Sequence, residues 1–249
     1  MPKKRVFNNV KVIIVKDYKE LSNLAAKIVL KKISGKKKFN LLVPTGTSPI
    51  GLYQILSKKR SKLKNCIFFN MDEYCVKKGK KIGYISPTDH RSYHYYMHEN
   101  LFNQIGQVKH FFPTFENVKE PGTYDKLIKK SGGIDLCINA FGEDGHTFGF
   151  NFPGTKFDSI TRLIKINDNT SKVNSKLTKM KTPEYGLTTG LKTGIGAKEV
   201  LVLASGKRKA EILKKIIYGS ITDKVPASIL RKHKKCIWIV DEDAAGKLV

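Results

Sequence analysis

Two acidic residues follow an apolar run and could carry proton transfer. Residues 66–70 are mostly apolar, and Asp72 and Glu73 come shortly after them. Apolar surroundings disfavour a charged carboxylate, which is a useful condition for a general base. Because neighbouring side chains of a strand point to opposite faces, at most one of the two carboxylates can face a given cleft. An acidic pair in a plain surface turn is the alternative interpretation.

A glycine-flanked loop places a carboxylate two residues before an imidazole. Residues 142–146 read Gly-Glu-Asp-Gly-His, so that only one glycine separates Asp144 from His146. A carboxylate at this spacing can orient a histidine and raise its basicity for proton transfer. A serine hydrolase of the nucleophile-elbow type would also need a Gly-x-Ser-x-Gly segment, which the sequence lacks. A polar loop without chemistry is the alternative.

Residues 44–49, Pro-Thr-Gly-Thr-Ser-Pro, form a bend of small residues that could bind an anion. Gly46 lets the backbone approach a ligand closely, and a helix with Ser48 as its N-cap is expected to follow. The start of that helix would offer N–H groups and the positive end of a dipole. Leu52 and Tyr53 stand where a Walker A loop needs Lys and Ser or Thr, so NTP hydrolysis is not predicted. An ordinary turn is the alternative.

Two further groups of residues could bind a phosphate or a metal. Residues 205–209, Ser-Gly-Lys-Arg-Lys, follow an apolar run and could supply a cation, or could form a plain solvated face. His90, His94 and His98 lie four apart and would form one stripe on a helix, which raises the possibility of a metal site. The aromatic residues between them favour packing, and His-Glu-x-x-His is absent. The sequence therefore predicts no metal.

The elements that must position these residues alternate between short apolar strands and helices. The predicted strands are residues 10–15, 39–43, 66–70, 134–140, 199–204 and 236–240. Helical patterns lie between several of them, including residues 21–29 and 208–218. This order predicts an α/β fold: a single domain, residues 1–249, with a mainly parallel Rossmann-like sheet and helices on both faces. Ligands bind beyond the carboxyl ends of such strands, where most of the motifs above fall.

Charge and composition narrow the function classes. The chain of 249 residues has a formal charge of +26, but only six of its 47 basic residues are arginines. The lysines are spread along the whole chain, so nucleic acid is not the expected partner. No apolar run approaches the ~20 residues of a membrane span, and the basic, polar start is not of secretory type. Four widely spaced cysteines are typical of reduced thiols in a cytoplasmic protein.

Taken together and in this order, the motifs resemble the glucosamine-6-phosphate deaminase (isomerase) family. Residues 69–74 and 92–102 are the most specific, because the related 6-phosphogluconolactonases share forms of residues 44–49 and 142–146. The matching segments are PTGTSPIGLY at 44–53, FNMDEY at 69–74, SYHYYMHENLF at 92–102, GGIDL at 132–136, GEDGH at 142–146, NSK at 174–176, PEYGLTTG at 183–190 and DEDA at 241–244.

The resemblance implies a hydrolase of amino sugar metabolism and N-acetylglucosamine catabolism. Such an enzyme converts glucosamine 6-phosphate and water to fructose 6-phosphate and ammonium, without a metal or organic cofactor. By the same resemblance, Asp72 is the general base that moves a proton between C2 and C1, His146 opens the sugar ring and Asp144 supports it. The residues implied to hold the phosphate are Thr45, Gly46, Thr47, Ser48, Lys176 and Lys209. The expected partner is this small amino-sugar phosphate, and either a monomer or a homo-oligomer fits.

The chain departs from the family pattern at two places in the site. The loop after His146 is one residue longer than the family spacing, so Phe152 stands where the family has a glutamate. Lys176 replaces an arginine, which loses a planar, two-pronged donor. Two competing functions stay open: a sugar-phosphate lactonase of the 6-phosphogluconolactonase type, and a catalytically weak basic binding protein.

Overall fold

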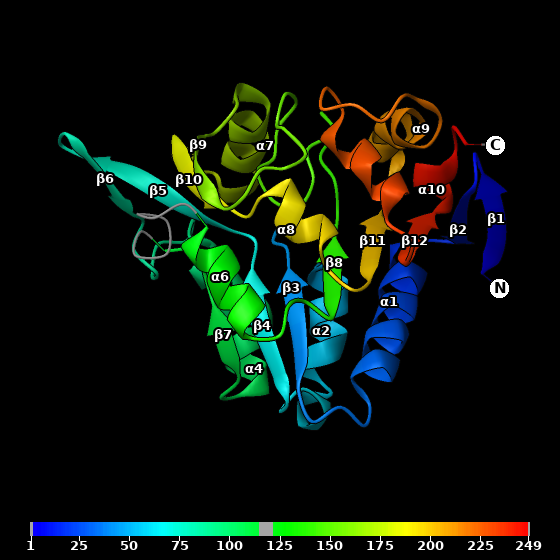
Figure 1. Ribbon diagram of the computed structural model, residues 1–249, viewed down its shortest axis with the longest axis horizontal. Coiled ribbons are helices and arrows are strands. Elements are labelled where there is room, and N and C mark those ends of the chain that lie inside the picture. The colour runs from blue at the N-terminus through cyan, green and yellow to red at the C-terminus, as the bar shows by residue number, and fades with distance from the viewer. Residues whose placement is uncertain (1, 115–121, 249) are drawn as a thin grey trace.

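The computed structural model describes residues 2–114 and 122–248, which form two β-sheets with helices packed around them (Figure 1). Neighbouring strands of the large sheet are parallel, except at one edge, where the two N-terminal strands form a hairpin. The eight strands of this sheet are, in spatial order, β1 (Lys3–Phe7), β2 (Val10–Val15), β12 (Cys236–Asp241), β11 (Val200–Ala204), β8 (Leu136–Asn139), β3 (Phe39–Val43), β4 (Cys66–Asn70) and β7 (Lys109–Phe111).

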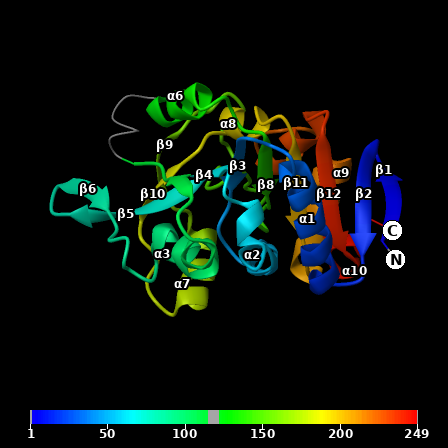
Figure 2. The same cartoon turned by 90° about the horizontal axis from the view of Figure 1, so that it is seen from below.

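Helices cover both faces of the large sheet (Figure 2). Side chains of its strands alternate between two buried clusters: in β3, Leu41 and Val43 join one cluster, and Leu42 joins the other. The first cluster is covered by α1 (Tyr18–Ile33), α2 (Ile50–Ser57), α3 (Tyr93–Met97), the π-helix η2 (His98–Phe102) and α4 (Asn103–Ile105). The second is covered by α6 (Thr123–Lys130), α8 (Leu191–Ile195), α9 (Ala210–Tyr218), η4 (Pro226–Lys232) and α10 (Glu242–Ala245).

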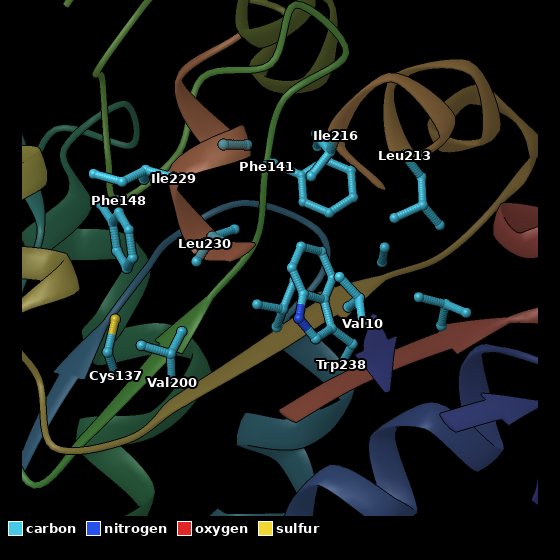
Figure 3. Close-up of a cluster of buried hydrophobic side chains, with 14 of the residues drawn as sticks. Val10, Cys137, Phe141, Phe148, Val200, Leu213, Ile216, Ile229, Leu230 and Trp238 are labelled. Atoms are coloured by element: carbon cyan, nitrogen blue, oxygen red, sulfur yellow. The ribbon is translucent and has the colours of Figure 1, made fainter. Parts of the chain in front are cut away.

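The second cluster also anchors the loops that follow β8. Figure 3 shows Trp238 of β12 and Phe141 among the side chains of α9. The rings of Phe141 and Trp238 lie 6.5 Å apart between centroids, and Phe148 is fully buried in the same cluster. Burying a phenylalanine side chain contributes about 1.5–3 kcal/mol, so these two side chains fix the chain on either side of His146.

A small antiparallel sheet lies beside the carboxyl end of β4 and carries helix α7 (Asp168–Thr178) (Figure 1). Met71 joins the two sheets, because its N–H donates to the Val43 carbonyl of β3 and its own carbonyl accepts from Thr189. The four strands are, in spatial order, β6 (Lys81–Tyr84), β5 (Asp72–Lys78), β10 (Tyr185–Thr188) and β9 (Arg162–Lys165). Two short 3₁₀ helices, η1 (Arg60–Lys62) and η3 (Lys207–Lys209), complete the described elements.

The predicted α/β class, the mainly parallel sheet and the helices on both faces are confirmed. Each of the six predicted strands is present, with β8 shorter than the predicted 134–140. The predicted cap at Ser48 is wrong, since Pro49 occupies the N-cap of α2 and no side chain caps it. Instead, the Gly51 N–H donates to the hydroxyl oxygen of Tyr18 at 2.8 Å, which satisfies one of the free donors of that helix start.

Two expectations drawn from composition can be compared with the structure. Three of the four cysteine thiols are buried and Cys236 is partly buried, and none of the four forms a disulfide, which agrees with the expected reduced thiols. Among the described residues, none of the helices combines the length and the apolar character needed to cross a membrane.

Candidate active site

A cleft opens beyond the carboxyl ends of β3, β4 and β8, where the predicted site residues were expected to meet. Its lining includes Asp72 and His146, together with residues of the 45–48 loop, α7 and η3. Seven of the nine predicted site residues line it: Thr45, Gly46, Thr47, Ser48, Asp72, His146 and Lys209. Asp144 lies behind His146 and is considered below.

Asp72 is the first residue of β5 and is almost completely buried, with 4% of its surface exposed. The Phe150 N–H donates to Asp72 Oδ1 at 3.0 Å and also to Thr188 Oγ1 at 2.9 Å. Burial raises the pKa of Asp72 to about 6, although hydrogen bonds from Thr188 and Phe150 partly oppose that shift. The Asp72 side chain is therefore a weak acid that can take up and return a proton near neutral pH.

Close approach of Phe150 to Asp72 depends on Gly149. This glycine has a φ of +92°, and a Cβ atom there would lie 2.2 Å from Asp72 Oδ1 and 2.6 Å from Thr188 Oγ1. Glycine alone adopts such a φ without strain and leaves that space open. The loop after His146 therefore contributes a backbone donor to the carboxyl group rather than a side chain.

Glu73 points away from the cleft and holds the start of α3. Its carboxylate accepts from the backbone N–H groups of Tyr93 and His94 at 2.9 and 2.8 Å, and from the Ser92 hydroxyl at 2.9 Å. A buried carboxylate at a helix N-terminus satisfies free N–H donors and complements the helix dipole. The expectation that only one of the adjacent acids faces the cleft is confirmed, and Asp72 is that residue.

His146 and Asp144 form a hydrogen-bonded pair, with Nδ1 of the imidazole 2.6 Å from Asp144 Oδ1. Asn167, the N-cap of α7, donates to Asp144 Oδ2 at 2.9 Å. Burial raises the pKa of Asp144, but the hydrogen bond and charge of His146 and the amide of Asn167 outweigh it and hold the pKa well below its usual value. An ionised Asp144 fixes the imidazole so that its Nε2 is the atom left for the cleft.

The environment of His146 contains a phenyl ring where the family pattern has a carboxylate. The rings of His146 and Phe152 lie 5.5 Å apart between centroids and are nearly perpendicular. Glu143, the nearest other acid in the sequence, is paired with Arg208 at 3.6 Å. The imidazole therefore has one carboxylate partner, Asp144, among the described residues.

The 45–48 loop lines the cleft, and its backbone N–H groups donate to no described residue, whereas three of its carbonyls accept hydrogen bonds from tyrosines. The Tyr96 hydroxyl donates to the Gly46 carbonyl at 2.6 Å, and the Tyr18 hydroxyl donates to the Thr47 carbonyl at 3.0 Å. Gly46 has a φ of +92°, which permits this bend. Such an arrangement of backbone donors suits an anion with several oxygen acceptors.

Two cations from η3, Arg208 and Lys209, line the same cleft. Lys209 Nζ donates to the Phe141 carbonyl at 2.5 Å, and burial together with the charge of Arg208 lowers the pKa of Lys209 to about 8. Arg208 Nη2 lies 3.4 Å from Thr47 Oγ1. The sequence identified Lys209 but not Arg208, although both belong to the basic segment 205–209.

Lys176 does not join the other phosphate-site candidates. It is exposed on α7 and is not among the described residues that line the cleft. The same helix contributes Asn169, Val173 and Asn174 to the lining, and Lys176, seven residues after Asn169, borders that face of the helix without being part of the lining. Its expected contact with a phosphate stays a prediction.

Comparison with known proteins gives a consistent result over most of the chain. A family model described as glucosamine-6-phosphate isomerases/6-phosphogluconolactonase matches residues 17–238. A glucosamine-6-phosphate deaminase of Mycoplasma mycoides is 36% identical over an alignment of 246 residues that covers 96% of this chain and 97% of that protein. One from a Thermoanaerobacter species is 38% identical over 253 residues, covering 95% and 94% of the two chains.

Solved structures agree with these relatives. A monomeric glucosamine-6-phosphate deaminase superposes with a TM-score of 0.86 at 32% identity, covering 96% of this chain and all of that chain. A 6-phosphogluconolactonase from Trypanosoma cruzi superposes with a TM-score of 0.76, but at 19% identity, so that this likeness concerns the fold alone.

Proposed function

This chain belongs to the enzyme family of glucosamine-6-phosphate isomerases and 6-phosphogluconolactonases, and on that premise we propose that it deaminates glucosamine 6-phosphate. The reaction consumes water and yields fructose 6-phosphate and ammonium. Relatives at 36–38% identity, named glucosamine-6-phosphate deaminases, support this branch of the family over the lactonases.

One observation carries the proposal most directly. A buried carboxyl group with a pKa of about 6, a carboxylate-bound imidazole and a loop of backbone donors open on the same cleft. Moving a proton between neighbouring carbons of a sugar phosphate requires a weak base, a group that opens the ring and an anchor for the phosphate.

In the proposed reaction, His146 acts first. It takes the proton of the anomeric hydroxyl and delivers one to the ring oxygen, which gives the open-chain aldehyde. The hydrogen bond between His146 and Asp144 supports this step, because Asp144 stabilises the imidazole when it carries both protons. The pair is a positioned acid and base of the kind that contributes about 10²–10⁴-fold to a rate.

Asp72 acts on the open chain. Its carboxylate removes the proton from C2 and returns it to C1, while the C1 oxygen gains a proton and the amino group at C2 loses one. The C1 aldehyde thereby becomes a hydroxymethyl group and C2 becomes an imine. Water then adds to C2 and ammonium leaves, giving the ketone of fructose 6-phosphate. A pKa of about 6 suits a group that must accept and return the same proton.

The 45–48 loop, Lys209 and Arg208 are proposed to hold the phosphate. Backbone N–H groups and two cations balance the charge of a phosphate dianion at one end of the substrate. The phosphate lies far from the bonds that change, so that this end of the cleft serves binding and orientation.

A coupled assay for ammonium tests the proposal. We expect release of ammonium from glucosamine 6-phosphate, and the same assay with galactosamine 6-phosphate measures the preference for the epimer at C4. Hydrolysis of a 6-phosphogluconolactone without ammonium release would instead assign a lactonase. Salt-sensitive binding of nucleic acid with no turnover of either substrate would assign a binding protein.

A further inference from the structure

Three imidazoles meet on the face of the molecule that α3, η2 and the edge strand β7 form. His94, His98 and His110 each have a potential ligand nitrogen, and these atoms all lie within 4.8 Å of one another. The rings of His94 and His98 are stacked with centroids 4.4 Å apart, and the rings of His98 and His110 lie 5.3 Å apart. The helical stripe read from the sequence is thus only partly correct, since exposed His90 packs against Tyr95 instead.

Hydrogen bonds orient two of these rings as they are oriented in metal sites. Nδ1 of His98 lies 3.0 Å from Asn103 Oδ1, and Nδ1 of His110 lies 3.0 Å from the Val108 carbonyl. The Asn103 amide is itself oriented, because its Nδ2 donates to Glu99 Oε1 at 3.3 Å. Both partners of the imidazoles are acceptors, so Nδ1 carries the hydrogen and Nε2 keeps its lone pair.

The lone pair of His98 is buried without a partner. Nε2 of His98 is enclosed and makes no hydrogen bond to any described residue. A buried polar atom without a partner is uncommon in folded proteins, and an unseen ion is one of its physical explanations. The ring of His94 also makes no hydrogen bond to a described residue, so that both of its nitrogens are available.

Aromatic side chains pack against the three imidazoles, each of which is partly buried. The ring of Phe102 stacks on His110 with centroids 4.5 Å apart, and the ring of Phe112 lies 4.8 Å from that of His94. Neutral imidazole is the form that binds metal ions, and an apolar surround limits competition by water.

We propose that His94, His98 and His110 bind one divalent transition-metal ion of the zinc class, with a fourth position open to water. Three histidines and a water are a common zinc ligand set, with Zn–N distances of roughly 2.0–2.1 Å. Tetrahedral geometry at that distance places the nitrogens roughly 3.4 Å apart, so that the rings must close slightly around the ion. The ring of His94 is the one expected to move, since packing against His98 and Phe112 holds it but no hydrogen bond to a described residue does.

The ion would fasten a helix to an edge strand rather than take part in the reaction. None of the three histidines lines the cleft. His94 is nevertheless tied to the site region, because its backbone N–H donates to Glu73, the neighbour of Asp72. Metal binding is therefore expected to stabilise α3 and β7, and removal of the metal is expected to leave the chemical step unchanged.

Titration of the tag-free, metal-stripped full chain with Co²⁺ and then Zn²⁺ tests the site. We expect one Co²⁺ per chain with the absorption bands of tetrahedral coordination, displacement by Zn²⁺, and a higher Tm with either ion. His98→Ala and His110→Ala should weaken binding by at least 10–100-fold, and Asn103→Ala by about 10–100-fold through loss of the second contact of His98. His90→Ala and His233→Ala are matched controls that should bind as the parent chain does.

Some outcomes would overturn the proposal. Failure of the parent chain to bind Co²⁺ below millimolar concentration, or unchanged affinity in His98→Ala and His110→Ala, excludes the site. If those two variants do not fold, the Asn103→Ala variant provides the test, because Asn103 is exposed. Unchanged Co²⁺ affinity of Asn103→Ala then counts against the metal site. The readouts are spectroscopic and thermal, so a negative result leaves the proposed deaminase activity untouched.

Discussion

Adjacent residues Asp72 and Glu73 have opposite roles in this molecule. The strand geometry of β5 sends Asp72 into the cleft and Glu73 to the start of α3. Burial raises the pKa of both carboxyl groups, but Glu73 has four hydrogen-bond donors and Asp72 has few. The less satisfied of the two is the one free to exchange a proton.

Replacement of Asp72 by Asn tests its role as the base. Asp72→Asn keeps the shape but cannot accept a proton, so turnover should fall by about 10²–10⁴-fold while substrate still binds. In the parent enzyme the base must be ionised. Because burial raises its pKa to about 6, kcat/KM should fall roughly tenfold for each pH unit below 6. A folded Asp72→Asn protein with near-normal turnover would contradict the assignment.

Gly149 can be tested with an unusually close control. Gly149 and Gly154 have φ of +92° and +90°, but only at Gly149 would a Cβ meet Asp72. Both alanine variants should lose stability, on the order of 1–3 kcal/mol from backbone strain. Only Gly149→Ala should also lose kcat, because it displaces the carboxyl group. Equal activity of the two variants at equal stability would show that the contact with Phe150 is dispensable.

The two lysines carried over to the phosphate site should behave differently. Lys209→Ala should raise KM by about tenfold or more, because it removes a charge-assisted contact at the end of the cleft. Lys176→Ala should raise KM less than Lys209→Ala does, since Lys176 is exposed and borders the lining rather than belonging to it. Steady-state kinetics at low salt measure both. A large effect of Lys176→Ala would show that its side chain reaches the bound phosphate.

At the scale of elements, the loop from His146 to Phe152 is where this chain departs most from the family pattern. Thr147 binds Asn139, Phe148 is buried with a φ of +51°, and Phe150 donates to Asp72. Residues along the whole loop therefore make specific contacts, and no single residue stands out as the inserted one. The longer loop also places the phenyl ring of Phe152 beside the imidazole of His146.

We expect ring opening to limit the rate for this reason. Phe152→Glu in the intact loop should place a second carboxylate beside His146 and speed cyclic glucosamine 6-phosphate by about tenfold or more. Phe152→Gln, with the same shape and no charge, is the matched control. A 5-deoxy analogue of fructose 6-phosphate cannot cyclise, and in the reverse direction with ammonium it should respond to neither substitution. Equal responses of both substrates would mean that ring opening does not limit the rate.

Six of the eight strands of the large sheet could be predicted because they are mostly buried and form nearly continuous apolar runs. The short edge strand β7 was missed, because Lys109–Phe111 is only partly buried. β1 escaped prediction, since an edge strand can consist of exposed basic residues, as Lys3–Phe7 does. The small sheet was also missed, because β5, β9 and β10 mix polar and apolar residues. Asn167 and Arg208 were missed for another reason: only the fold brings these single polar residues into contact with the candidate site residues Asp144 and Thr47.

At the scale of the whole molecule, a net charge of +26 surrounds a cleft that is proposed to take a phosphate dianion. Such a field attracts the substrate over distances that salt shortens, from a Debye length of about 10 Å at 0.1 M to about 3 Å at 1 M. We expect kcat/KM to fall as inert salt is added, while kcat stays constant. Measuring both between low and high ionic strength checks this. A parallel fall of kcat would instead indicate that salt acts on the folded structure.

The position of Met71 between the sheets has a consequence for the reaction. Asp72 begins the small sheet, whereas His146 follows β8 of the large one, and the backbone of Met71 is hydrogen-bonded to both sheets. The spacing between the proposed base, Asp72, and the imidazole of His146 is thus set by how one sheet docks on the other. A substitution far from the cleft that loosens this docking would leave the sugar bound. It would, however, displace Asp72 and His146 relative to one another, so that they could not both reach the atoms between which they are proposed to move protons. Such a substitution would then lower kcat more than it lowers the affinity for the substrate or the Tm.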